Sequence, residues 1–370
     1  MRTKVNEKGY VSPRKFRYLI IVGLVFLGIS ILLSWFSRDE QAVERYYANG
    51  FYPLFSFIAK GLFSWIPFSV GDLVYVGLFV AIIYFFVSSL IALSNKFLKR
   101  TILRLLQLMF LLLATYVYFH ISWGQNYYRV PLQKQFSLDV QTVTQDEYIS
   151  VVERYIDSLN RIRASIDIRL QDRSLAETDI EQLMLASSEK FPMLSRTQVK
   201  VKHPISSHLI SFFTVTGYFN PFTQEVHVNQ MMPKTSYPFT VAHELTHQMG
   251  IGLEDECNFV AFLALRDHSN PWYRYAAYYE TVQYLLRPLY YQDKSKYSSY
   301  LNLMSDEVRS DYNADKEFWK GYRSWINTVS AHLYGSYLRH NNQPEGIARY
   351  TLMGRLVVAW EYQRKISPIN

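Results

Sequence analysis

Hydrophobic residues are distributed differently in the two parts of this chain of 370 residues. The N-terminal part contains three apolar runs without Asp, Glu, Lys or Arg, at 18–36, 73–93 and 105–123. Each is about as long as the ~20 residues that a helix needs to cross a hydrocarbon core of about 30 Å. Tyrosine and tryptophan residues fall near the ends of the runs, where interfacial aromatics are enriched. We therefore predict three transmembrane helices in an α-helical membrane region, residues 1–124.

A fourth apolar stretch, residues 53–68, lacks the pattern of a clean span. Lys60, Gly61 and Pro67 interrupt it. A charge and two weak helix formers within so few residues favour a segment that lies in the membrane interface or re-enters the membrane. We expect no fourth crossing.

Basic residues predict the orientation of the spans. They lie before the first run (Arg2, Lys4, Lys8, Arg14, Lys15 and Arg17) and between the second and third (Lys96, Lys99, Arg100 and Arg104). Cytoplasmic segments carry such an excess, so three crossings place the rest of the chain outside the cytoplasm. The net charge of +8 is then largely a topology signal, and we expect no nucleic-acid partner. The first run lacks a small-residue cleavage site and is too long for a signal peptide, so we expect it to be retained.

Residues 125–370 are predicted to form one extracytoplasmic domain, mainly α with some β structure. Helical spacing of apolar residues is found at 143–166, 175–191, 275–286, 305–311, 316–334 and 348–361. Cys257 is the only cysteine of the chain, which forbids an internal disulfide even in an oxidising compartment. The domain must therefore be stabilised by packing.

A small sheet is expected in the middle of this domain. Residues 199–202 alternate as a strand does, and 212–219 with 225–229 form a predicted hairpin around Asn220 and Pro221. The edge strand of such a sheet can hold an extended peptide by strand addition.

The candidate chemistry follows this sheet directly, in the sequence His243-Glu244-Leu245-Thr246-His247. On a helix, positions i and i+4 share one face, so the two imidazoles can bind one metal ion. Glu244 lies beside them and can act on a water at that metal. This is the HExxH pattern of zinc hydrolases, and we expect one zinc ion.

The residues around this pattern favour a short helix. Ser236 is a candidate N-cap and Pro238 suits the first turn, while Gly250 and Gly252 can end the helix. A second helical run begins at Glu254.

A catalytic zinc site takes three protein ligands and leaves one position open. Glu254 is our choice for the third ligand, with Glu256 as the alternative that the sequence leaves open. Asn258 lies four residues after Glu254 on the same helical face, so it can hydrogen-bond a ligating imidazole.

HExxH followed by Glu-x-x-x-Asn resembles the gluzincin-type zincins, such as the thermolysin-like enzymes. That resemblance implies His243, His247 and Glu254 as ligands and Glu244 as the general base, although the connection of six residues between His247 and Glu254 is shorter than theirs.

The whole chain is similar to a bacterial membrane family, domain of unknown function 3810, in three segments: Pro67-Phe68-Ser69-Val70-Gly71-Asp72, Trp123-Gly124-Gln125-Asn126-Tyr127-Tyr128-Arg129 and Pro238-Phe239-Thr240-Val241-Ala242-His243-Glu244. This resemblance implies a bacterial inner membrane and a periplasmic domain, and it implies no substrate.

Together these features predict a membrane-anchored zinc metallopeptidase that hydrolyses peptide bonds in a peptide or protein substrate. His227, Tyr218 and Tyr350 are candidate donors to the oxyanion. The alternative is a non-catalytic membrane scaffold or binding protein with a zincin-like domain.

Overall fold

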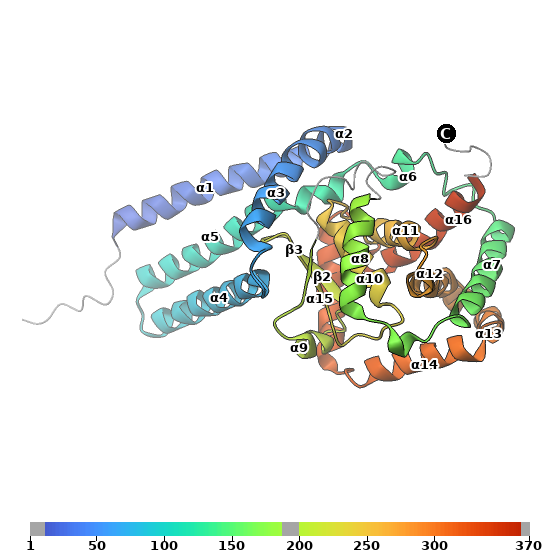
Figure 1. Ribbon diagram of the computed structural model, residues 1–370. Coiled ribbons are helices and arrows are strands. Elements are labelled where there is room, and N and C mark those ends of the chain that lie inside the picture. The colour runs from blue at the N-terminus through green and yellow to red at the C-terminus, as the bar shows by residue number, and fades with distance from the viewer. Residues whose placement is uncertain (1–11, 187–199, 364–370) are drawn as a thin grey trace, which may run out of the picture.

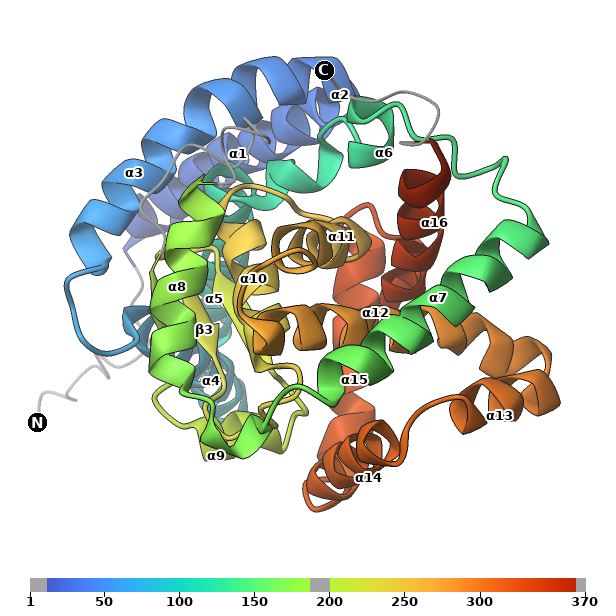
Figure 2. The ribbon, with the colours of Figure 1, turned by 45° about the vertical axis from the view of Figure 1, so that its right-hand side comes forward.

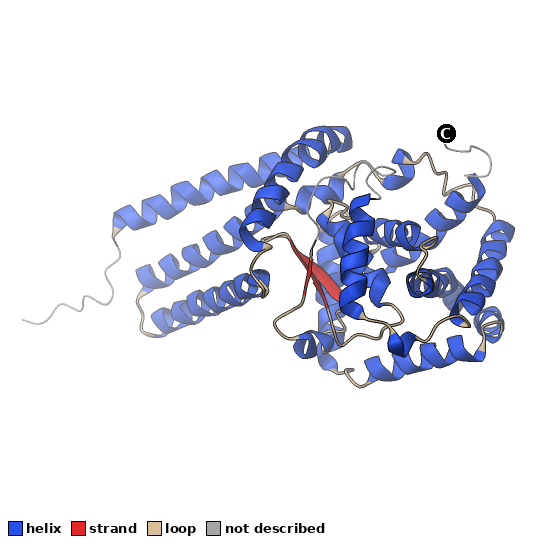
Figure 3. Cartoon of the chain, in the orientation of Figure 1, coloured by secondary structure: helices blue, strands red, loops and turns tan. Residues whose placement is uncertain are grey.

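The computed structural model describes residues 12–186 and 200–363. It is mainly helical, with one three-stranded sheet beside the long N-terminal helices (Figures 1 and 3). The helices that carry the apolar runs lie together at one end, and the remaining helices form a compact body at the other (Figure 1).

Three helices are long and apolar enough to cross a membrane: α1 (Pro13–Phe36), α4 (Val70–Ser94) and α5 (Leu98–Ser122). Within this part of the chain α5 packs against both of the others, and most of their apolar side chains face outward. The three predicted helices are thus confirmed as candidate spans. All three begin a few residues before their apolar runs.

Between α1 and α4 the chain forms α2 (Glu40–Ala42), the π-helix η2 (Val43–Phe51) and α3 (Tyr52–Phe63). The stretch at 53–68 is therefore helical over most of its length. Leu54, Phe57 and Leu62 are exposed, whereas Tyr52 and Lys60 are buried against the rest of the protein. An exposed apolar face is what a helix in the membrane interface requires, so the interfacial placement stays our prediction.

The sheet has the order β1-β3-β2, with β1 (Val201–Lys202) parallel and β2 (Gly217–Asn220) antiparallel to β3 (Glu225–Val228). Of the predicted first strand at 199–202, only Val201 and Lys202 form β1. Lys200 precedes the strand, and Val199 is outside the described residues. Strand β2 is an edge strand.

The predicted strand at 212–219 is wrong in its first half. The helix α9 (Ser207–Ser211) precedes it, because the Ser206 side chain accepts a hydrogen bond from the Leu209 amide and caps that helix. Thr214 then takes a left-handed φ of 54°, which interrupts an extended chain. Pairing with β3 begins only at Gly217.

The other helices are α6 (Leu132–Gln135), α7 (Gln145–Arg163), α8 (Arg173–Ala186), α10 (Tyr237–Gln248), α11 (Glu254–Leu265), α12 (Pro271–Gln292), α13 (Lys294–Asn302), α14 (Asp306–Lys320), α15 (Trp325–His340) and α16 (Met353–Gln363). Figure 2 shows α10 enclosed by α8, α11 and α12, with the sheet beside it. All twelve residues of α10 are buried.

Several predicted helix limits are corrected. The helix expected at 316–334 is two helices, because the chain turns after Lys320 and Ser324 caps α15. The helix predicted at 305–311 is the first part of α14, which continues to Lys320. Helix α13 was not predicted. The predicted helix at 348–361 begins as the 3-10 helix η7 (Gly346–Leu352) before α16, and the end of the one at 175–191 is outside the described residues.

The N-terminus of α4 is fastened to the sheet by a buried carboxylate. Glu225 accepts hydrogen bonds from the backbone amides of Val70 and Gly71, at 3.2 and 2.6 Å. It also accepts from the Thr223 hydroxyl and forms a 2.5 Å ion pair with Lys202. A negative charge at a helix N-terminus is favourable, so this carboxylate joins a candidate span to the sheet.

Replacing this carboxylate with an amide tests how much it contributes to the stability of the fold. Glu225→Gln leaves the Lys202 ammonium buried without its ionic partner, so we expect the free energy of unfolding to fall by about 3–5 kcal/mol. Denaturant titration of the full chain in detergent measures it. The matched control is Glu317→Gln, which breaks an exposed pair with Lys320 and should cost less than about 1 kcal/mol. Equal losses in both variants would contradict the assignment.

Candidate metal centre

Helix α10, which carries HExxH, begins and ends largely as expected. Pro238 lies in its first turn, and Gly250 follows its end with a φ of 92°, a value that side chains rarely allow. Ser236 occupies the expected N-cap position, but its side chain makes no capping hydrogen bond. Its hydroxyl donates instead to the Glu280 carboxylate, so the first turn is tied to α12.

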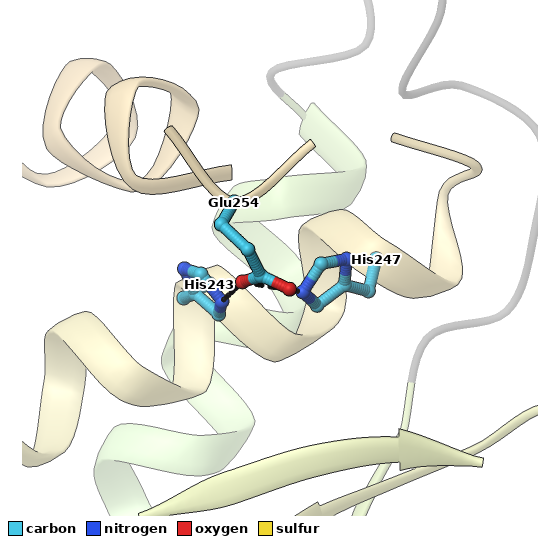
Figure 4. Close-up of side chains that lie close together, drawn as sticks. All are labelled: His243, His247 and Glu254. Atoms are coloured by element: carbon cyan, nitrogen blue, oxygen red, sulfur yellow. Dashed lines mark ion pairs between the residues drawn. The ribbon is translucent and has the colours of Figure 1, made fainter. Parts of the chain in front are cut away.

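Three side chains meet on one side of this helix (Figure 4). The Nε2 atoms of His243 and His247 lie 3.3 and 3.4 Å from the same oxygen, Oε2 of Glu254. One ligand atom from each residue lies within 4.8 Å of the others, and all three residues are buried. HExxH supplies two of them because of the i, i+4 spacing, and the first residue of α11 supplies the third.

Hydrogen bonds fix which nitrogen of each imidazole is free. The Nδ1 of His243 lies 2.8 Å from Oδ1 of Asn258, and the Nδ1 of His247 lies 2.9 Å from the carbonyl of Ile251. Both partners are acceptors, so each Nδ1 carries a proton and each Nε2 is turned toward Glu254. A metal ion bound there would take each ring in its neutral form, through the Nε2 lone pair. Asn258 thus occupies the role expected from its spacing.

The two oxygens of the Glu254 carboxylate lie in different environments. Its Oε1 accepts a 2.9 Å hydrogen bond from the Tyr334 hydroxyl, and Tyr334 had not been singled out in the sequence. Its Oε2 is buried and lacks a hydrogen-bond partner among the described residues. Burial raises the pKa of Glu254, but His247 and His243 outweigh burial and hold it well below its ordinary value. Two imidazole lone pairs around an ionised carboxylate are a donor set that fits a divalent metal ion.

Glu256, the alternative third ligand, points elsewhere. Its carboxylate accepts a 2.7 Å hydrogen bond from the backbone amide of Leu132. Among the described residues, Glu256 is not part of the group that could hold a metal ion. Of the two alternatives, only Glu254 lies with the two histidines.

Glu244 is buried at the same site. Burial raises the pKa of its carboxyl above the ordinary value, with His243 and His247 acting in the opposite direction. Its Cγ lies so close to β2 that a Cβ on Gly217 would be only 2.7 Å away. A glycine at the start of the edge strand therefore makes room for this carboxylate.

The cluster opens into a cleft of about 1600 Å³, which Glu244, His243, His247 and Glu254 all line. Tyr350 also lines it, and its hydroxyl lies 3.2 Å from that of Tyr334.

The other two candidate oxyanion donors are placed less favourably. His227 is completely buried and stacked beneath Tyr218, with ring centroids 4.6 Å apart, so it does not face the cleft. Tyr218 does line the cleft, but its hydroxyl donates to Asp72.

The C-terminal end of α10 is held by residues next to the candidate spans. Trp123 donates its indole N–H to the carbonyl of His247 at 3.2 Å, and Tyr52 donates its hydroxyl to that of Gln248 at 2.8 Å. Arg129 donates to the carbonyl of Gly250 at 2.7 Å. The last carbonyls of a helix lack intrahelical partners, so these side chains complete its end.

Metal analysis tests the ligand set directly. We expect the purified full chain to bind one divalent ion, and His243→Ala and Glu254→Ala each to lose it because each removes a donor. Elemental mass spectrometry after metal supplementation measures the content. Glu256→Ala is the matched control and should keep the metal, since its carboxylate contacts Leu132. Loss with Glu256→Ala but not with Glu254→Ala would reverse the assignment.

A second prediction concerns Asn258. Asn258→Leu removes the acceptor that orients His243, so metal affinity should fall by about 10- to 100-fold. Competition with a chelator of known affinity gives the value. Asn258→Asp keeps an acceptor oxygen in place and should retain the affinity. A purely structural role for Asn258 predicts no such difference between the two variants.

Comparison with known proteins gives a family and no activity. A family model described as protein of unknown function (DUF3810) matches residues 47–358, which include the second half of η2, all of α3 and the entire cluster. No curated protein and no solved structure matches the chain. The match covers most of the sequence, so the chain belongs to the DUF3810 family.

Proposed function

We propose that this protein is a membrane-anchored zinc metallopeptidase. The observation that carries the proposal is the convergence of His243, His247 and Glu254 on one point, with the buried carboxylate of Glu244 beside them in a large cleft. Two histidines and one carboxylate are the ligands of many catalytic zinc sites, which favours zinc among the divalent ions.

When bound, zinc would polarise the substrate carbonyl and lower the pKa of a water toward neutrality. Glu244 accepts the proton of the attacking water at its carboxylate and returns it to the leaving amine.

Two hydroxyls are available for the developing negative charge on the substrate. Tyr350 lies over His243, with ring centroids 6.4 Å apart, and Tyr334 is hydrogen-bonded to Glu254. Tyr350 is the better candidate donor, because Tyr334 donates to the charged Glu254 carboxylate, whereas the Tyr350 hydroxyl lies 3.2 Å from the neutral hydroxyl of Tyr334.

The edge of β2 is suited to hold the peptide. The Asn229 amide donates to the Thr216 carbonyl, so the alternation of an antiparallel ladder turns the backbone groups of Gly217 and Phe219 toward the free edge. Both residues line the cleft. Main-chain pairing there would bind an extended substrate with little demand on its sequence, in a zincin-like arrangement.

We further propose that the cleft faces the periplasm from a bacterial inner membrane. Lys96 in the loop between α4 and α5, with Lys99, Arg100 and Arg104 in the first turns of α5, supports a cytoplasmic position for that loop. The metal cluster is tied to the opposite end of α5 through Trp123.

Glu244→Gln tests the reaction. The probe is a degenerate library of peptides carrying a fluorophore and a quencher, incubated with the zinc-loaded full chain in detergent. Loss of the base should lower cleavage by about 100-fold or more. Zinc content should stay unchanged, because Glu244 is not among the three ligands. Equal cleavage by wild type and Glu244→Gln would favour a binding protein over a peptidase.

A further inference from the structure

We propose that the substrates are polypeptides anchored in the same bilayer, cleaved in the extended segment next to their anchor. This inference deepens the proposed peptidase function and rests on it. It is carried by the path of the cleft, which starts beside the candidate spans, passes the metal cluster and ends among charged side chains.

The first part of the cleft runs along α5. Leu112, Thr115, Tyr116 and Phe119 of that helix line it. Leu112 precedes Ser122, the last residue of α5, by ten positions, which at 1.5 Å per residue is about 15 Å along the axis. This distance is about half the thickness of a hydrocarbon core. The cleft therefore extends beside a part of α5 that lipid would surround.

The elements on either side of this opening present apolar residues to the outside. Leu209 and Phe213, in and just after α9, are exposed, and on α15 Trp325, Val329 and Leu333 form an exposed stripe at intervals of four residues. Such stripes in contact with water are rare unless another apolar medium covers them.

Contacts place these elements beside the spans. The Ile205 amide, just before α9, donates to Asp72 of α4 at 2.8 Å, and Tyr337 of α15 packs against Phe119 of α5 with ring centroids 6.0 Å apart. Figure 1 likewise shows α9 and α15 on the side of the body that faces the long helices. The bilayer is therefore the medium that fits their apolar stripes.

The far part of the cleft carries charged side chains, which lie among many tyrosines. Glu280 and Arg287 of α12 line it, as do Asp315 and Lys316 of α14. A polypeptide that emerges from a bilayer has the same order of chemistry, an apolar anchor followed by a polar segment. With its anchor beside α5, such a chain would cross the cluster next to the edge of β2. A freely soluble peptide would gain nothing from the apolar end.

The test uses the full chain in vesicles of phosphatidylethanolamine and phosphatidylglycerol. Two probes share one quenched fluorogenic peptide library, one soluble and one fused to a transmembrane helix of leucine and alanine. Leu112→Trp and, separately, Thr115→Trp fill the membrane end of the cleft. Met109→Trp is the matched control, because Met109 is 64% exposed on the same helix and does not line the cleft.

We expect Leu112→Trp and Thr115→Trp to lower cleavage of the anchored probe by about tenfold, because the added indole fills the space that the anchor would occupy. Cleavage of the soluble probe should be unchanged, which also shows that the variants fold. Met109→Trp should affect neither probe. All variants see the same probe density, so enrichment at the membrane surface cannot produce the difference.

The failures of the two proposals are distinguishable. Glu244-dependent cleavage that is equal for both probes, or an anchored probe equally affected by Leu112→Trp and Met109→Trp, would overturn this inference and leave the peptidase function standing. Absence of Glu244-dependent cleavage of either probe would overturn the proposed function and this inference together.

Discussion

The arrangement of the protein depends on how the end of the HExxH helix is completed. Carbonyl groups at the end of α10 need donors, and three side chains from the region of the spans supply them, Tyr52, Trp123 and Arg129. Arg129 is itself held by an ion pair with Glu44 of η2 at 2.7 Å. Because the two histidines project from this helix, the same contacts that anchor the helix also fix the distance of the metal cluster from the membrane helices.

The fold could be predicted where the signal is local. Apolar runs gave the three candidate spans, and Pro238 and Gly250 gave the limits of α10. Elsewhere the pattern was ambiguous. Residues 212–216 resemble a strand but form the turn after α9, where Thr214 takes a positive φ, and the π-helix η2 has no simple periodicity to reveal it. Segments of mixed pattern, such as the one around Gly321, follow whichever caps the surrounding fold supplies.

The candidate site divides in the same way. His243, His247 and Glu254 lie within twelve residues, so spacing alone could bring them together, and Asn258 followed from the same helical face. Tyr334 comes from a helix eighty residues further on and contacts Glu254 only through the tertiary fold. His227 had looked available for catalysis, yet its position on the central strand β3 buries it under Tyr218. A residue type indicates possible chemistry, whereas its position in the sheet decides access.

The contacts of Tyr52 and Trp123 with α10 also bear on when the cleft forms during synthesis and folding. Both donors precede α10 in the sequence and are therefore synthesised before it. If the end of α10 needs these two donors, then α10 reaches its final structure only after the candidate spans that precede it have folded beside it. A chain that has missed the membrane would carry all the chemical groups of the cluster and lack the frame that aligns them. Completion of the cleft would then follow the placement of the candidate spans.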